Sequence, residues 1–221
     1  MTEPDDPAPP PELHSAAVRC FGERLPIAVR YASLLITDGV VRGLIGPRES
    51  SRLWDRHLLN CAVVAELIPP NARVIDVGSG AGLPGVVLAL ARPDLTVVLV
   101  EPMARRVAFL TEVVAALALD RTSVVRARAE ECVRGRSRLE PADIVTARAV
   151  ASLDRLAAWC LPLVRPGGRL LALKGESAVR EIEDHRKAVT RAGGAEPVIR
   201  RCGEGVLSTP TTVVEIIKRS R

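Results

Sequence analysis

The stretch VIDVGSGAGLPG at positions 74–85 decides the fold, because a short apolar run leads directly into four glycines. Gly78, Gly80 and Gly82 alternate with other residues, and the last six residues of the stretch also match the pattern GxGxxG. Glycines placed after a strand allow a ligand to approach the backbone closely. Pro84 suits the first turn of a following helix. The stretch therefore predicts a strand, a loop that binds a nucleotide-like ligand, and a helix.

Beyond this loop, short β-branched runs alternate with helical stretches. The predicted strands cover residues 73–78, 96–101, 123–130, 142–148, 169–175, 197–202 and 212–219. The predicted helices cover residues 84–92, 104–119, 153–163 and 176–192. This alternation predicts an α/β fold of the doubly wound class, with a mostly parallel seven-stranded sheet covered on both faces. The last two strands have no helix between them, so we expect them to pair antiparallel.

The chain before the sheet has a different character. Residues 1–12 are acidic and rich in proline, and we expect a disordered tail. Residues 13–70 show apolar positions at helical spacing, interrupted by the glycine-containing stretch TDGVVRGLIGP. We therefore predict an N-terminal helical segment over 13–70 and one α/β domain over 71–221.

Composition limits the function classes. With 48% hydrophobic and 26% charged residues, the 221-residue chain has the composition of a folded globular protein, and its longest apolar runs are too short to cross a bilayer. Its five cysteines include no CxxC pair, so we expect reduced cytosolic thiols rather than a disulfide framework or a zinc site. The net charge of +5 permits a polyanionic partner without requiring one.

Three carboxylates indicate which ligand the loop would bind. Glu101, at the end of the second strand, is placed to accept the ribose hydroxyls of either NAD or S-adenosylmethionine (SAM). Asp76 precedes the glycines, where its charge suits the cationic amino-acid end of SAM better than the anionic pyrophosphate of NAD. Glu130 follows Ala129 after the third strand, where an adenine would be held. The order favours a class I SAM-dependent methyltransferase; an NAD-dependent oxidoreductase and a non-catalytic ribosome-associated RNA-binding protein stay open as alternatives.

Several further stretches carry a family resemblance. They are RHLLN at 56–60, VIDVGSGAGLPGVVLALARPD at 74–94, VEPMARRVAFL at 100–110, RAEE at 128–131, ARAVASL at 147–153 and LLALKGE at 170–176. In this order they resemble the bacterial small-subunit rRNA guanine-N7 methyltransferases, the glucose-inhibited division protein B family, in an actinobacterial form. Residues 35–49, LITDGVVRGLIGPRE, depart from the family's usual tryptophan and Asn-Leu-Thr stretch, which puts any substrate contact there in doubt.

The resemblance implies SAM contacts at Gly78, Leu83, Ala129, Glu130 and Arg148. It also implies methylation of guanine N7 in the 530 loop of 16S rRNA, with the rRNA presented within the 30S subunit or an assembly intermediate. In such families, loss of the activity is linked to low-level streptomycin resistance. We expect a monomer in the cytoplasm.

Methylation of guanine N7 requires few catalytic groups from the protein. Guanine N7 carries a lone pair and no proton, so its attack on a sulfonium methyl group needs alignment and electrostatics rather than a general base. Arg148 and Lys174 follow the fourth and fifth strands, at the ligand-binding edge, and are the candidate catalytic residues. Either cation would serve in contacts to a phosphate or a guanine edge. The competing interpretation for both is a salt bridge to a carboxylate such as Asp76.

The aromatic residues and histidines provide few candidate site residues. The five aromatic residues are Phe21, Tyr31, Trp54, Phe109 and Trp159. Helical spacing assigns all of them except Tyr31 to the core. With so few aromatic residues, the protein has little means of holding a base by stacking alone. We therefore expect an assembled ribosomal particle to present the base. His57 is either a site residue or, in the favoured interpretation, a hydrogen-bonded structural histidine.

Overall fold

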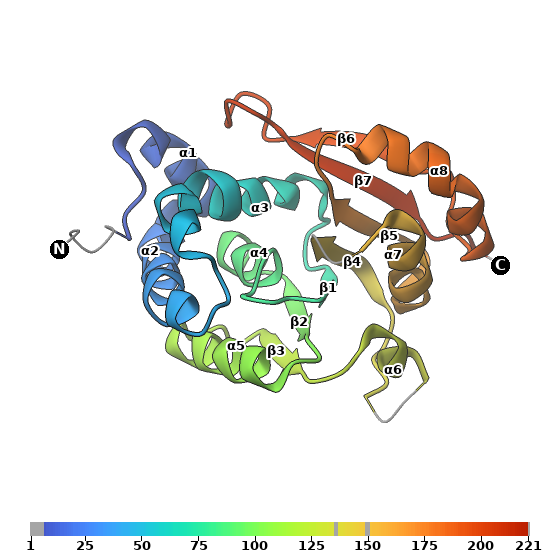
Figure 1. Cartoon of the computed structure of the whole chain (residues 1–221), viewed down its shortest axis with the longest axis horizontal. Helices are drawn as coiled ribbons and strands as arrows, with labels where there is room; N and C mark the ends of the chain where they lie inside the picture. Colours follow the sequence, from blue (N-terminus) through green and yellow to red (C-terminus); the bar gives the residue numbers. More distant parts are fainter. Residues whose placement is uncertain (1–6, 135–136, 149–150, 221) are drawn as a thin grey trace.

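In the computed structural model, which describes residues 7–134, 137–148 and 151–220, a single seven-stranded sheet runs through the molecule (Figure 1). The strands are β1 Arg73–Val77, β2 Thr96–Val100, β3 Thr122–Val125, β4 Ala142–Arg148, β5 Val164–Leu173, β6 Val198–Cys202 and β7 Thr211–Ile217. Their order is β3-β2-β1-β4-β5-β7-β6. The first five strands are parallel, and β7 pairs antiparallel with both β5 and β6. The predicted doubly wound fold and the antiparallel last pair are confirmed.

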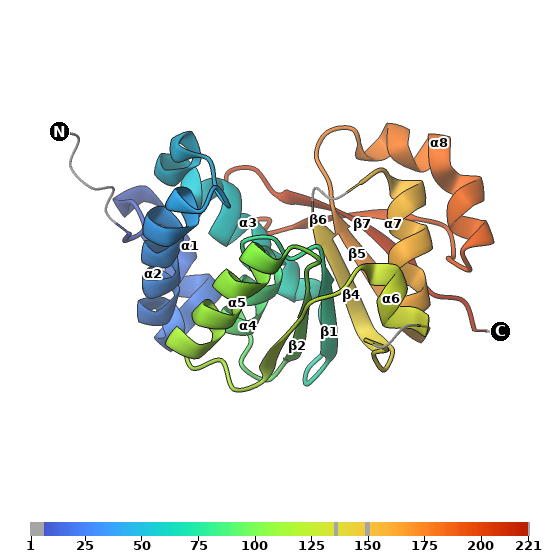
Figure 2. The same cartoon turned by 60° about the horizontal axis from the view of Figure 1, so that its bottom comes forward.

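Helices cover both faces of the sheet (Figure 2). They are α4 Gly85–Ala91, α5 Ala104–Ala116, α6 Ala129–Arg134, α7 Leu153–Cys160 and α8 Ala178–Arg191. On one face α4 packs on β1 and β2 while α5 packs on β3; on the other, α7 packs on β4 and β5 while α8 packs on β7. The right-handed connections between parallel strands bring the strand ends that follow β1, β2, β3 and β4 to one edge of the sheet.

An N-terminal helical layer lies outside α4. It contains α1 Pro11–Phe21, η1 Gly22–Arg24, α2 Leu25–Leu34, η2 Leu35–Gly39, η3 Pro47–Arg52, η4 Leu53–Leu59, α3 Asn60–Ala62 and η5 Val63–Leu67, of which η2 and η4 are π-helical. The segment is helical as predicted, but the predicted link at 37–47 is partly helical, because η2 extends to Gly39 and η3 begins at Pro47. Because α1 begins at Pro11, the last two residues of the predicted tail are helical, and residues 1–6 lie outside the described residues.

The N-terminal layer and the sheet share one hydrophobic core. Val74 and Leu99 pack in the same cluster as Phe21 and Leu58 of the layer, whereas Ile75 belongs to the cluster beneath α7. Successive strand residues point to opposite faces, so β1 alternates between these two cores. The helical segment is therefore built into the α/β body rather than attached beside it.

The third strand is shorter than predicted. β3 ends at Val125, which pairs with Val100, the last residue of β2, so the chain beyond it has no partner strand. The Arg128 amide donates to Glu131 Oε2 at 2.8 Å and starts helix α6, which the sequence pattern did not reveal. Within the described ranges, no helix has the length and apolar character needed to cross a bilayer.

Candidate functional site

The glycine loop forms a tight turn at the end of β1. Gly78, Gly80 and Gly82 have φ values of 72°, 59° and 103°, a region that favours glycine. The Gly78 amide donates to Val100 O at 2.8 Å, which fixes the loop to the neighbouring strand. A Cβ atom on Gly82 would lie 2.6 Å from Val86 Cγ2, so this position has no room for a side chain. The loop therefore has the conformation predicted from its sequence.

Tyr31 of α2 anchors this loop from below. Its side chain is fully buried, and its hydroxyl donates a hydrogen bond to Ala81 O at 2.7 Å. Burial raises the pKa of the phenol well above its ordinary value, so the hydroxyl keeps its proton. Tyr31 was the one aromatic residue not assigned to the core, and that assignment is wrong. Its contact with the loop depends on the packing of α2, which lies 50 residues away in sequence.

Asp76 lies beneath the loop, buried against α4. Its carboxylate accepts hydrogen bonds from the Gly85 amide at 3.1 Å and from Thr146 Oγ1 at 2.9 Å. Burial raises its pKa to about 6, and hydrogen bonds offset part of that rise. Strand alternation points the side chain toward α4, so Asp76 is fully buried, whereas we expected it to face a cofactor. Its observed role is to join β1, β4 and the start of α4.

Glu101 connects the loop to the end of β2. Its side chain is 1% exposed, and its two carboxylate oxygens accept the amides of Gly80 and Met103, each at 3.0 Å. Arg106 of α5 lies 3.7 Å from the same carboxylate. An ionised carboxylate has further lone pairs beyond these two bonds. Glu101 therefore holds the loop and still has acceptor capacity for a ligand.

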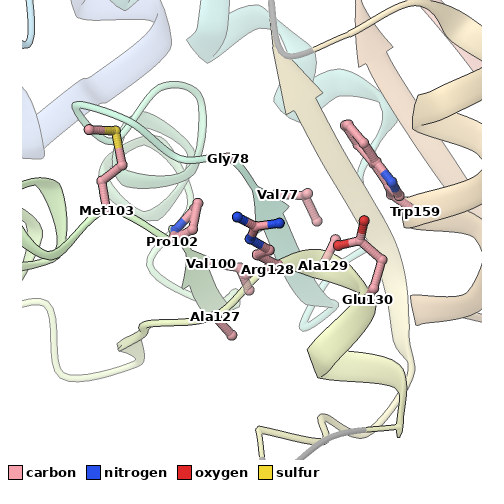
Figure 3. Close-up of a pocket in the computed structure, with 10 residues that line it drawn as sticks. All are labelled: Val77, Gly78, Val100, Pro102, Met103, Ala127, Arg128, Ala129, Glu130 and Trp159. Atoms are coloured by element: carbon pink, nitrogen blue, oxygen red, sulfur yellow. The ribbon is translucent and has the colours of Figure 1, made fainter.

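Two adjoining cavities open at this edge of the sheet. The first, of about 470 Å³, is the Trp159 cavity, lined by Val77, Gly78, Val100, Pro102, Met103, Ala127, Arg128, Ala129, Glu130 and Trp159 (Figure 3). The second, of about 570 Å³, is the Arg148 cavity, lined by Leu44, Ile45, Gly46, Glu49, His57, Gly78, Ser79, Gly80, Ala81, Leu83, Glu101, Pro102, Met103, Arg106 and Arg148. They share Gly78, Pro102 and Met103, so one elongated ligand can reach both.

The Trp159 cavity suits a flat apolar ring. Val77 and Val100 form its floor where β1 and β2 end, and Ala129 and Glu130 lie at its edge, as predicted. The Trp159 side chain stands across from Glu130 (Figure 3). Trp159 was predicted to be a core residue; it is only partly buried and lines the cavity, because its place on α7 faces the end of β4. The aromatic ring adds a wall that the sequence pattern concealed.

The Arg148 cavity is polar and carries two arginines. Five predicted residues line it: Gly78, Gly80, Leu83, Glu101 and Arg148. Arg148 donates to Cys61 Sγ at 3.0 Å and to His57 Nδ1. Within the described part of the chain no ion pair joins Arg148 to a carboxylate, so the competing interpretation, a salt bridge to Asp76, is not met there. The arginine therefore has N–H groups that no carboxylate of the described residues binds directly, and it lines the cavity.

Besides the buried Asp76, two predicted residues lie outside the linings of both cavities. Lys174 Nζ forms a salt bridge with Glu181 Oε2 at 2.7 Å and donates to Ala151 O at 2.8 Å, and it lines neither cavity in the described structure. Gly82 also lies outside the two linings and serves the packing against Val86. Sequence reasoning did not find Glu49, and the structural role was the favoured interpretation for His57, although both line the Arg148 cavity together with Arg106.

Together the two cavities fit a nucleoside that carries a charged tail. The strand order differs from the dinucleotide-binding order 3-2-1-4-5-6, because β7 is inserted antiparallel beside β5. Among solved structures, the chain resembles an S-adenosyl-L-methionine-dependent methyltransferase from Methanococcus maripaludis, described as putative. The TM-score is 0.57 at 15% identity, over 84% of this chain and 91% of that one. It also resembles an rRNA methylase from Streptococcus thermophilus, with a TM-score of 0.51 at 15% identity, over 73% of this chain and 95% of that one. The fold is that of class I methyltransferases.

Comparison with sequences identifies the family. The chain is 64% identical to the ribosomal RNA small subunit methyltransferase G of Salinispora tropica over 95% of this chain and 88% of that one. It is 55% identical to the protein of the same name from Mycobacterium leprae, over 91% and 82% of the two chains. The family model described as rRNA small subunit methyltransferase G matches residues 24–209. The chain belongs to the rRNA small subunit methyltransferase G family.

Proposed function

We propose that this protein transfers the methyl group of SAM to N7 of a guanine in the 530 loop of 16S rRNA. The observation that carries the proposal is the pair of adjoining cavities beside the glycine loop, in a chain of the rRNA small subunit methyltransferase G family. A protein that only binds RNA does not need a cavity shaped for a nucleoside and its tail. An NAD-dependent oxidoreductase fits neither the strand order nor the family.

The residues present suit SAM. The apolar floor at Val77 and Val100, with Trp159 at the side, provides contacts for an adenine ring. Glu101 has acceptor capacity where ribose hydroxyls would lie. Arg148, without a carboxylate partner among the described residues, offers donors to the carboxylate of the amino-acid end. In this assignment Asp76 acts indirectly, by holding the Gly85 amide and thereby the loop.

The protein's contribution to the reaction is alignment. When bound, SAM would supply an electrophilic methyl group on a sulfonium sulfur, which the N7 lone pair would attack in line, with S-adenosylhomocysteine as the leaving group. The S–CH₃ bond breaks as the N7–CH₃ bond forms, and no proton moves. Arg148 and the loop at Gly78 and Gly80 hold the reacting atoms in line, which provides rate without a general base. Lys174 stays in the proposal as a contact to RNA phosphate rather than to the cofactor.

The acceptor is proposed to be an assembled particle. The chain has five aromatic residues, of which Tyr31 and Phe109 are fully buried, so few are free to stack on an extruded base. A 30S subunit or an assembly intermediate would present the loop already shaped. Both cavities are lined by one chain, so a monomer suffices. A ribosomal substrate implies a cytoplasmic reaction, and loss of the enzyme would give low-level streptomycin resistance.

The test is transfer of a labelled methyl group from SAM to small subunits and to naked 16S rRNA, both from a strain that lacks the enzyme. Cleavage specific for N7-methylguanine then locates the product. A single cleavage in the 530 loop supports the proposal, and Arg148→Ala should abolish it while His185→Ala, on α8, should not. SAM binding without transfer to either RNA substrate would refute the proposed acceptor, and absence of SAM binding would refute the proposed cofactor.

A further inference from the structure

Arg148 is held by two neutral acceptors. Its NH1 group donates to the fully buried thiol of Cys61 at 3.0 Å, and its NH2 group contacts Nδ1 of His57. Burial raises the pKa of the Cys61 thiol, so it stays uncharged. A guanidinium has five N–H donors, so two contacts leave three of them for other partners. Since Arg148 lines the cavity, these are the donors that a ligand can use.

The contact with Arg148 fixes the protonation state of His57. A guanidinium can only donate, so Nδ1 must be the accepting nitrogen and the ring proton must lie on Nε2. Nε2 lies 2.8 Å from Oε2 of Glu49, to which it donates. Glu49, His57 and Arg148 thus form one directed chain of hydrogen bonds, in which the imidazole is neutral and its tautomer is set at both nitrogens.

The charges around His57 agree with this arrangement. Burial and the positive charge of Arg148 lower the pKa of His57, and its hydrogen bond lowers the pKa of Glu49. Arg56 acts in the same direction on the ring, while Glu49 opposes it. At neutral pH the ring is therefore uncharged and Glu49 is ionised. A second proton on the ring would place an N–H against the guanidinium, which removes the acceptor and adds a repulsive charge.

The chain of hydrogen bonds joins two parts of the fold. Glu49 lies in η3 and His57 in η4, both in the N-terminal layer, whereas Arg148 ends β4. All three residues line the Arg148 cavity, opposite the glycine loop at Gly80. Cys61 lies in α3 of the same layer, so both side chains that hold the guanidinium in the described structure come from the N-terminal layer.

We propose that Glu49 and His57 are positioning residues that orient Arg148, so that its remaining N–H groups face the anionic group of the ligand. Under the proposed function, on which this inference rests, that group is the carboxylate of the cofactor. Glu49 fixes the tautomer of the His57 ring, and the ring fixes the orientation of the Arg148 guanidinium. The guanidinium then binds the carboxylate of the cofactor. The divergent stretch 35–49 thereby contributes to the cofactor site through its last residue.

The test compares variants at position 57 by calorimetric binding of S-adenosylhomocysteine. His57→Leu removes both hydrogen bonds, whereas His57→Asn keeps an acceptor near the place of Nδ1 and does not titrate. We expect Kd to rise roughly 10-fold or more in His57→Leu and to stay within about 3-fold of wild type in His57→Asn. Glu49→Gln should fall between them. His185→Ala, whose histidine lies 3.8 Å from Asp154, is the matched control and should bind as wild type does.

Two further readouts separate positioning from a general loss of structure. In the ligand-free wild type, imidazole ¹⁵N shifts should report the Nε2–H tautomer at pH 7. As the pH falls and the His57 ring gains its second proton, binding of S-adenosylhomocysteine to the wild type should weaken. The part of this weakening that is due to the ring should be absent from His57→Asn. Asp76 titrates in both proteins, so only the difference between them reports on His57.

Different results would refute the positioning role of Glu49 and His57 and the proposed methylation of rRNA. Equal Kd values for wild type and His57→Leu, or an Nδ1–H tautomer, would overturn the positioning role while methyl transfer to RNA continued. Normal S-adenosylhomocysteine binding with the expected variant effects, but no methylation of rRNA, would refute the proposed acceptor and leave the positioning role in place. A wild type that does not bind S-adenosylhomocysteine would overturn both.

Discussion

Replacing Tyr31 with phenylalanine removes a single oxygen from beneath the glycine loop. The lost hydrogen bond spans 2.7 Å between the fully buried hydroxyl and Ala81 O. Leaving a buried polar group without a partner costs about 1–3 kcal/mol. For a chain of this size, each kcal/mol lowers Tm by about 2–4 °C, so we expect a decrease of about 2–12 °C. Because Ala81 lines the Arg148 cavity, the loop should also bind its ligand less well.

A matched control separates stability from binding. Thr211 Oγ1 donates to Asn60 O at 2.9 Å from a side chain that is 3% exposed, and Thr211 lines neither cavity in the described structure. Thr211→Val should lower Tm by a similar amount. In calorimetry, only Tyr31→Phe should raise the Kd for S-adenosylhomocysteine, by about 3- to 10-fold, or 0.7–1.4 kcal/mol. If both variants bind the ligand like wild type, Tyr31 does not shape the binding loop and the reasoning fails.

Three other predictions concern Asp76, Gly85 and Lys174. Asp76→Asn removes a carboxyl whose pKa of about 6 in the folded protein exceeds its ordinary 3.8, so the wild type loses stability as the pH rises through this interval and the variant does not. Thermal unfolding should therefore favour the variant more at pH 8 than at pH 5, and the opposite trend would refute the assignment. Gly85→Ala would place Cβ 2.3 Å from Leu99 Cδ2 and should cost about 1–3 kcal/mol by overpacking. Gly175→Ala, with nothing within 4 Å, should unfold like wild type, and equal Tm values for both variants would contradict the packing argument. Lys174→Ala breaks the pair with Glu181, so it should lower Tm and raise the KM for RNA more than the Kd for SAM; equal losses would assign Lys174 to the cofactor.

Local signals in the sequence were sufficient to predict the sheet and the loop. Three alternating glycines after a strand predict a tight loop, and the positive φ values that Gly78, Gly80 and Gly82 adopt are ones that glycine permits whatever its distant neighbours are. The alternation of strands and helices also depends only on neighbouring residues, and it was sufficient to predict the parallel sheet. β3 was predicted too long because the alternating arginines and alanines at 126–129 continue a period of two after its partner, β2, has ended at Val100. Strand length is set by pairing, which a single run of sequence does not contain.

The site was harder to predict because it joins distant segments. Trp159 was predicted to lie in the core and Tyr31 was not, but the reverse is observed. The tyrosine is fully buried under the loop, and the tryptophan lines a cavity. Helical spacing identifies an apolar face but not the element that will cover it. Asp76 was assigned by charge alone, yet the period of two along β1 already pointed its side chain toward α4. His57 received a structural role, and its partner Arg148 lies 91 residues away.

The shared core of the N-terminal layer and the sheet has a thermodynamic consequence. A ligand in the Arg148 cavity would be bound by Gly78 and Arg148 of the sheet, and Arg148 is held in turn by His57 and Glu49 of the layer, so the ligand's binding energy would be distributed over both parts. Each tenfold excess of ligand over Kd adds about 1.4 kcal/mol against any opening that separates the two parts. Amide hydrogens in α1 and α2, far from any ligand atom, should therefore exchange more slowly when the cavity is filled.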